Sequence, residues 1–187
     1  LDMACHVRFF RRAREGVNHE EEKIMKNATR KITYAAMIAA LYAALTLILQ
    51  PLSFSNVQFR VSEALTILPT LTADAIPGLS IGCLLANWIA GAPWFDVVFG
   101  TLATLLGAFL TYKTRKNPLA ASLMPVLTNG LITGPVVYFG YVWKAGTPIL
   151  WGALAGTMAS VAGGELVVCV VLGLLLRKAL LKTKLFK

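Results

Sequence analysis

Charged residues are scarce in this sequence. Of its 187 residues, 14% are charged and 57% are hydrophobic. A soluble domain has about 25% charged residues, so the composition excludes an ordinary soluble protein and indicates one that lies in a lipid bilayer. Because a membrane-spanning helix needs about 20 apolar residues, the length accommodates about six spans.

Cysteine and histidine are scarce as well. The three cysteines are an odd number, and Cys83 and Cys169 lie within apolar runs, which argues against a disulfide framework. Both histidines lie in the polar N-terminal stretch, so a buried metal site has almost no ligands available. No GxxxxGK[ST] phosphate loop is present, so the chain has no ATP-binding loop of this type. We therefore expect no metal and no cofactor in this chain.

Apolar segments fill the sequence after residue 31. Polar residues, prolines and glycines separate six of them, at about 32–50, 58–73, 75–91, 95–112, 118–142 and 148–176. This pattern predicts an all-α fold, a polytopic bundle of six transmembrane helices over residues 25–187. The second segment is the weakest, because its core of about 12 residues after Ser62 reaches only about 18 Å across a core of about 30 Å.

Residues 1–24 differ from the rest of the chain. They are polar, mix five acids with basic residues and contain no apolar core of the signal-peptide type. We expect them to be a disordered or non-native extension, outside the six-helix domain.

The basic residues gather in clusters beside the apolar segments. The net charge is +9, but no basic face studded with aromatic residues is left over for nucleic acid. One cluster precedes the first segment, one follows the fourth and one closes the chain, and an even number of spans separates each from the next. Under the positive-inside rule all three lie in the cytoplasm, as do both termini. The clusters are Arg8 to Lys31, Lys113 to Lys116, and Arg177 to Lys187.

Acidic residues are rare after residue 31. There are four of them, Glu63, Asp74, Asp96 and Glu165, and an ionised side chain at the bilayer centre costs about 2.5–3.5 kcal/mol or more. Asp74 precedes Pro77 and is typical of a helix N-cap. Asp96 follows Pro93, so it either favours the start of a helix or contacts a ligand.

Glu165 has no explanation as a cap, because it interrupts the middle of the sixth segment. Counting helix rise from the segment ends places Glu165, Asn129 and Asn87 at similar depths of about 17–20 Å from the inner boundary. These three side chains form either a ligand site or an interhelical hydrogen-bond cluster that only fixes the packing.

The stretch VQFRVSEALTILP lies at the outer end of the second segment. Arg60 could pair with Glu63 across one helical turn, or reach a ligand together with Gln58. With aromatic residues such as Trp94 available for stacking, these residues predict an outward-facing pocket for a flat, nitrogen-rich molecule.

Alanine recurs at helical spacing in the first segment. Two neighbouring series are present, Ala35, Ala39 and Ala43, and Ala36, Ala40 and Ala44. Small residues four apart let another helix approach closely. The spacing by itself leaves open whether that helix belongs to this bundle or to a partner.

Five stretches in order resemble the QueT family, the substrate-binding (S) components of energy-coupling factor importers associated with queuosine precursors. They are KNATRKITYAAMIAALYAALT, VQFRVSEALTILP, AIPGLSIGCLLANWIAG, DVVFGTLATLLGA and GGELVVCVVLGLLL. The resemblance covers about residues 25–180. QFRVSEAL is highly specific in combination with the rest.

The resemblance implies a six-helix S component in the plasma membrane of a prokaryote. Such a protein captures a 7-deazaguanine precursor from outside and reorients in the membrane. It docks onto a transmembrane scaffold subunit carrying two ATPases, which use the ATP. The family's docking surface is the small-residue face of the first helix, which favours Ala36, Ala40 and Ala44. Glu165 or Glu63 could accept two N–H groups of the precursor, and the other acid or Asp96 could balance an aminomethyl cation.

Three competing functions stay open at this point. The chain could be an S component for another vitamin-like heterocycle, or a solitary carrier in which Glu165 relays protons or cations. An intramembrane enzyme is the least favoured, because no catalytic Ser/His, Cys/His or metal-ligand set lies at membrane depth.

Overall fold

The structure of this chain is a computed structural model. It describes the backbone of residues 3–50 and 59–183, and the side chains of those ranges from residue 23 onward. All regular elements in these ranges are helices, which confirms the predicted all-α class. The chain divides into two compact units, Leu1–Tyr34 and Ala35–Lys187.

Helix α1 (Met3–Ile48) is the helix of the first unit, and its last residues belong to the second unit. Residues 3–24, for which we expected disorder, are helical here, and they are rich in the strong helix formers arginine and glutamate. At the end of this unit the Arg30 guanidinium lies 5.5 Å from the centre of the Tyr34 ring. The domain boundary after residue 24 and the non-native origin of the extension stay predictions.

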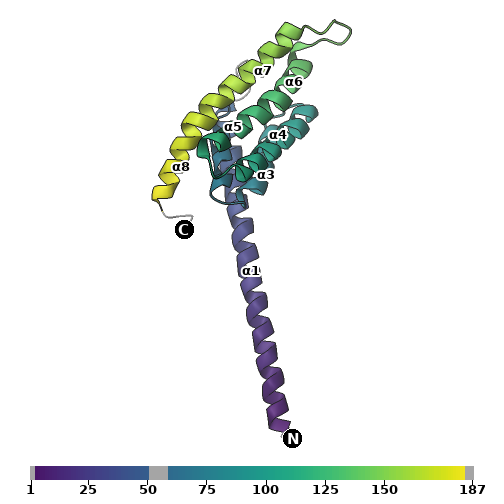
Figure 1. The fold of residues 1–187 in the computed structure, drawn as a ribbon. Helices are drawn as coiled ribbons and strands as arrows, with labels where there is room; N and C mark the ends of the chain where they lie inside the picture. Colours follow the sequence, from purple (N-terminus) through teal and green to yellow (C-terminus); the bar gives the residue numbers. More distant parts are fainter. Residues whose placement is uncertain (1–2, 51–58, 184–187) are drawn as a thin grey trace. The chain divides into compact units, whose positions relative to one another are not determined.

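The second unit is a bundle of helices (Figure 1). Its elements after α1 are η1 (Val61–Thr70), α3 (Ala75–Ile89), α4 (Trp94–Lys113), α5 (Pro118–Thr128), η2 (Asn129–Thr133), α6 (Gly134–Val137), η3 (Tyr138–Val142), α7 (Trp151–Leu166), η4 (Val167–Leu172) and α8 (Gly173–Lys182). Helix α4 packs against both α3 and α5, and α7 packs against α6 and η2.

Four helical runs in the described ranges are long and apolar enough to cross a membrane. They are Lys23–Ile48, Trp94–Lys113, Pro118–Val142 and Trp151–Lys182. These runs correspond to the first, fourth, fifth and sixth predicted segments. The second and third segments form shorter helices, η1 and α3, so the count of six spans stays a prediction.

Element η1 explains why the second segment is short. It is a 3₁₀ helix of ten residues with Pro69 inside it, and a 3₁₀ helix rises about 2.0 Å per residue, or about 20 Å here. Its residues from Ser62 to Pro69 are all buried. Irregular backbone is tolerated at membrane depth where protein surrounds it, so η1 is an internal element that carries Glu63 into the core.

Small residues let α1 and α3 approach closely. A Cβ added at Gly78 would lie 2.6 Å from the Ala35 carbonyl oxygen, and one added at Gly82 would lie 2.8 Å from the Tyr42 Cβ and 2.9 Å from the Ala39 carbonyl oxygen. The series Ala35, Ala39 and Ala43 therefore faces this bundle. Ala36, Ala40 and Ala44 are exposed on the neighbouring face of α1.

We expect Gly82→Ala to lower the stability of the folded protein. The new methyl group would overlap Ala39 and Tyr42 on α1, and overpacking of this kind costs about 1–3 kcal/mol. Gly156→Ala is the matched control, because nothing lies within 4 Å of a Cβ at Gly156 in helix α7. The unfolding midpoint in detergent measures both, and equal midpoints would contradict the close packing of α1 on α3.

The predicted helix caps are only partly correct. Asp74 precedes α3, but its side chain makes no capping hydrogen bond, so that prediction is wrong. Its φ of −65° and ψ of −13° are already helical, whereas a capping side chain needs an extended backbone. Asn117 has that geometry and caps α5 by accepting from the backbone N–H groups of Leu119 and Ala120.

Candidate functional site

Charged and amide side chains lie buried in the interior of the second unit. They are Arg60, Glu63, Asn87, Asp96, Asn129 and Glu165, each at most 5% exposed. Buried charges are costly unless they are paired or hydrogen-bonded. The contacts described below join these six side chains into one group, which we call the buried polar cluster. Most sequence-predicted site residues belong to it, and their role in substrate binding stays a prediction.

Arg60 and Asp96 form one end of the buried polar cluster. The guanidinium Nη2 lies 3.9 Å from Asp96 Oδ2, and the Tyr141 hydroxyl donates a hydrogen bond of 3.2 Å to the same oxygen. Asp96 lies in the first turn of α4, where no side-chain cap is formed. The carboxylate therefore faces inward, and the structure pairs Arg60 with Asp96 across two elements.

Asn87 joins this end from α3. Its Nδ2 donates to Cys83 Sγ at 3.5 Å, and the Thr104 hydroxyl of α4 donates to the same sulfur at 3.3 Å. A Cβ added at Gly100 would lie 3.2 Å from Asn87 Nδ2 and 3.6 Å from Asp96 Oδ1. Gly100 therefore lies close to the amide and the carboxylate, and a side chain at this position would crowd the amide.

Glu63 occupies the middle of the buried polar cluster. The Tyr42 hydroxyl of α1 donates a hydrogen bond to Glu63 Oε1, and Thr104 lies beside the same carboxylate. One turn along α1, the Thr46 hydroxyl donates to Ser62 Oγ at 2.7 Å. These bonds hold the first turn of η1 against α1 and fix the Glu63 side chain in place.

Glu165 and Asn129 form the other end. The Cys169 thiol donates to Glu165 Oε2 at 3.2 Å, and the Asn129 side chain contacts the Glu165 carboxylate. Asn129 opens the π-helical segment η2, and Cys169 lies in the π-helical segment η4 that follows α7. Short π-helical segments are frequent at functional sites, and here they place both side chains toward the same interior.

Three oxygen atoms of the buried polar cluster have no hydrogen-bond partner among the described residues. They are Glu63 Oε2, Asn87 Oδ1 and Asp96 Oδ1. A buried acceptor without a partner costs about 1–3 kcal/mol. All three are acceptors, so a molecule that bound to them would supply hydrogen-bond donors. Within the described part of the chain no group of His, Cys, Asp and Glu is suited to a metal ion.

Two predicted residues lie apart from the buried polar cluster. Trp94 is 74% exposed at the start of α4, where its ring packs edge-on against Phe95. Because it faces outward there, the structure does not bring it to the buried acids. Gln58 lies outside the described residues, and its predicted role stays a prediction.

Sequence reasoning missed several members of the buried polar cluster. Tyr42, Thr104, Cys83 and Cys169 all contact its charged or amide side chains. A helical-spacing signal was available for the cysteines, since Cys83 is four residues before Asn87 and Cys169 four after Glu165. Tyr42 and Thr104 had no comparable signal, because their neighbours come from distant elements.

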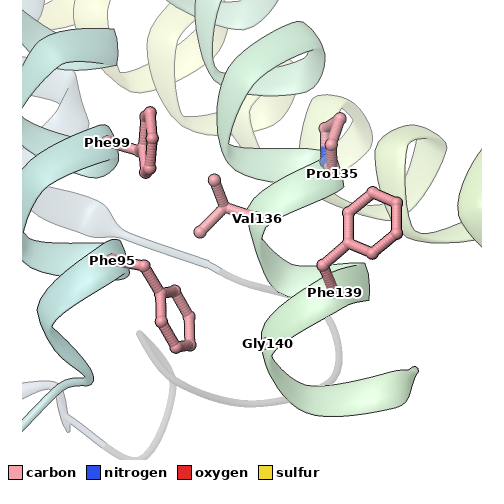
Figure 2. Close-up of a pocket in the computed structure, with 6 residues that line it drawn as sticks. All are labelled: Phe95, Phe99, Pro135, Val136, Phe139 and Gly140. Carbon is pink, nitrogen blue, oxygen red and sulfur yellow. The ribbon is translucent and has the colours of Figure 1, made fainter. Parts of the chain in front are cut away.

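A separate apolar pocket of about 260 Å³ lies between α4 and the α6–η3 run (Figure 2). Phe95 and Phe99 form one side, with Pro135, Val136, Phe139 and Gly140 opposite. None of these six residues has a polar side chain. A nitrogen-rich molecule would lose its hydrogen bonds there, so we place the candidate site in the buried polar cluster.

Long apolar helices around a buried polar cluster are typical of a helical membrane protein whose interior polar residues serve a substrate or ion. A sequence model described as QueT transporter matches residues 32–182. The chain is also 30% identical over 164 residues to the "Queuosine precursor transporter QueT" of Lactococcus lactis subsp. cremoris (strain MG1363), which covers 76% of this chain and 92% of that protein. No solved structure matches the chain. The chain belongs to the QueT transporter family, which indicates transport rather than catalysis.

Proposed function

We propose that this chain is the substrate-binding (S) subunit of an energy-coupling factor importer, and that it captures a queuosine precursor of the 7-deazaguanine type from outside the cell. The observation that carries the proposal is a set of acceptor oxygens on Glu63, Asn87 and Asp96, which have no hydrogen-bond partner within the described ranges. A deazaguanine presents adjacent N–H donors along one edge, and such an edge complements buried acceptors. The relative from Lactococcus lactis is named for a cargo of this class.

The proposed setting is the plasma membrane of a prokaryote, with six spans and both termini in the cytoplasm. The basic clusters beside the apolar segments support this orientation. The chain would work with a transmembrane scaffold and two ATPase subunits, since its own sequence has no phosphate loop. ATP is used by those partners, and this chain needs no cofactor.

Equilibrium binding to the purified chain tests the proposed cargo. We expect 7-deazaguanines to bind and a panel of vitamins to bind far more weakly, when measured by isothermal titration or by ligand-induced thermal stabilisation. Tight binding of a vitamin from the panel, with no response to deazaguanines, would instead assign another S-component specificity.

The exposed alanine face of α1 supports docking onto the scaffold. Ala36, Ala40 and Ala44 are exposed, whereas Ala39 and Ala43 are buried against this bundle. We expect Ala40→Leu to leave precursor binding unchanged and to reduce co-purification with the scaffold and ATPases at least several-fold, because a flat strip of small residues permits close helix approach.

Ala39→Leu is the matched control, since the same substitution one position earlier enters the close contact with α3. That variant should lose stability, which the unfolding midpoint of the isolated chain would show. Normal assembly of Ala40→Leu with its partners would exclude this face as the docking surface.

A solitary carrier is a second candidate, favoured by the two acids Glu63 and Glu165 that lie buried within one interior. Intramembrane acids of this kind also serve as proton or cation relays. Liposomes containing this chain alone decide between the two. Precursor uptake driven by an ion gradient would favour the carrier, and uptake that requires the partners and ATP would favour the S component.

A further inference from the structure

The apolar pocket between α4 and the α6–η3 run is separate from the buried polar cluster, because none of its lining residues belongs to that cluster (Figure 2). Its two walls belong to runs that are long and apolar enough to cross a membrane, Trp94–Lys113 and Pro118–Val142. Phe99 on one wall is 42% exposed, and Phe139 on the other is 46% exposed. The pocket therefore opens on the outer surface of the bundle, where lipid surrounds a membrane protein.

Tryptophans mark the end of the bundle at which this pocket lies. Phe95 comes from the first turn of α4 and Gly140 from the last turn of η3, and the two meet in the pocket. The four tryptophans of the chain lie in or beside these turns and their neighbours, with Trp88 near the end of α3, Trp94 at the start of α4, Trp143 after η3 and Trp151 at the start of α7. Tryptophan is enriched at the membrane–water interface, so the pocket lies just inside the level of the lipid headgroups.

Lys144 supplies a positive charge at the same end. It directly follows Trp143 and is exposed. Three of the four acids of the second unit are buried, and Asp74 precedes α3, a full helix length from Trp88. The undescribed stretches of this unit, 51–58 and 184–187, contain no acidic residue in their sequence. An anionic group from outside the second unit therefore complements this lysine.

The size and lining of the pocket suit an acyl chain. Its walls run from Phe95 to Phe99 and from Pro135 to Gly140, which is about 6–8 Å along a helix. A partner helix is about 10–12 Å across, so a volume of about 260 Å³ does not hold one. A hydrocarbon chain loses no hydrogen bond among these side chains, and it restores the dispersion contacts that an empty space forfeits.

We propose that the pocket and Lys144 form a binding site for a phospholipid with an anionic headgroup. One acyl chain lies between Phe99 and Phe139, and the headgroup lies beside the Lys144 ammonium. This site takes a lipid rather than the cargo, so it goes beyond the proposed function and does not depend on it. A lysine at the membrane surface contributes about fivefold to the affinity for an anionic lipid.

Tryptophan fluorescence of the purified chain in detergent tests the site. Trp94 packs on Phe95 of one wall and Trp143 on Phe139 of the other, each with ring centres 6.0 Å apart, so a brominated acyl chain in the pocket lies close to both indoles and quenches them. We expect saturable quenching by phosphatidylglycerol with brominated chains. Phosphatidylcholine with the same chains should need about fivefold more lipid for half-saturation. Quenching that does not saturate and is equal for both lipids would overturn the proposal.

Two variants then locate the two parts of the site. Lys144→Gln should remove the preference for phosphatidylglycerol, and an unchanged preference would exclude this lysine as the headgroup contact. Val136→Phe places a ring in the pocket, so we expect both lipids to bind about fivefold more weakly or worse. Val171→Phe is the matched control, since Val171 is exposed on η4, outside the pocket, and it should bind both lipids normally.

Unaltered lipid binding by a folded Val136→Phe protein would show that the acyl chain does not occupy this pocket. A dimer of the unaltered chain that Val136→Phe abolishes would assign the pocket to a second copy and overturn the lipid site. Lys144 is exposed, so the comparison of the two lipids on Lys144→Gln decides the role of the headgroup even where Val136→Phe does not fold.

Discussion

Asp96→Asn is expected to lower both the stability of the protein and its affinity for precursor. The substitution removes the carboxylate that lies 3.9 Å from the buried guanidinium of Arg60. Removing one partner of a buried ion pair costs about 3–5 kcal/mol, because the other charge stays buried. We expect about 3 kcal/mol, the low end of that range, since Glu63 also lies near the guanidinium.

A double variant separates the pair from its surroundings. Arg60→Met should also destabilise the protein, because it leaves Asp96 without its cation. Combining Arg60→Met with Asp96→Asn should recover part of the loss, since no uncompensated charge remains at this end of the buried polar cluster. Unfolding curves of the unaltered chain, the two single variants and the double variant give the coupling energy between Arg60 and Asp96. A coupling energy near zero would show that the pair does not stabilise the fold.

The same four proteins report on function. Asp96 Oδ1 and Asn87 Oδ1 are acceptors that we assign to the heterocycle. Asparagine at position 96 keeps one oxygen but replaces the charged acceptor by a neutral one, so the double variant should remain weak in binding even where its stability returns. Stability and binding that recover together would mean that Asp96 serves the fold alone.

Glu165→Gln is expected to weaken binding of the 7-deazaguanine precursor by about 10- to 100-fold while the protein stays folded. The loss corresponds to one charged hydrogen bond of about 1.5–3 kcal/mol. Glutamine has nearly the same shape and can still accept from the Cys169 thiol, which lies 3.2 Å from Glu165 Oε2. Packing around η4 is therefore expected to survive.

Isothermal titration measures the affinity, and the unfolding midpoint without ligand confirms the fold. Cys169→Ala is a useful companion, because it removes the thiol donor and leaves the carboxylate charge in place. Full affinity in a folded Glu165→Gln protein would exclude this acid from the substrate site and favour a structural hydrogen-bond cluster instead.

Helical structure was predictable from the sequence, but the form of the helices was not. Periodic apolar runs indicate that a segment is helical and buried. They do not indicate that Val61–Thr70 is a 3₁₀ helix, or that Asn129–Thr133 and Val167–Leu172 are π-helical. These variants differ from an α-helix by one residue per hydrogen-bonded turn, and packing against neighbouring helices decides which of them forms.

The two alanine series show the same limit on one helix. Both have helical spacing, and the sequence offers no means of choosing between them. The choice comes from α3, where Gly78 and Gly82 admit the backbone at Ala35 and Ala39. Ala36, Ala40 and Ala44 are left on the exposed face, which is the face that we propose for docking.

The buried acids show what spacing can and cannot supply. A lone acid in an apolar run is conspicuous because it is costly in a bilayer, so Glu165 and Asp96 could be selected without a structure. Their partners could not be selected in this way. Arg60 pairs with Asp96, and Glu63 accepts from Tyr42, so each contact joins elements far apart in the chain.

The sequence by itself determined that this chain is a helical membrane protein of the QueT transporter family, with a few polar residues that an apolar interior tolerates only for a reason. Composition and local spacing carry that information, because the cost of a polar group in a bilayer is a property of the single residue. The tertiary structure decided which polar groups meet, which acceptors stay open and which alanine face is free. Those outcomes depend on how distant helices pack, and contact distances between remote residues are not encoded in any local period.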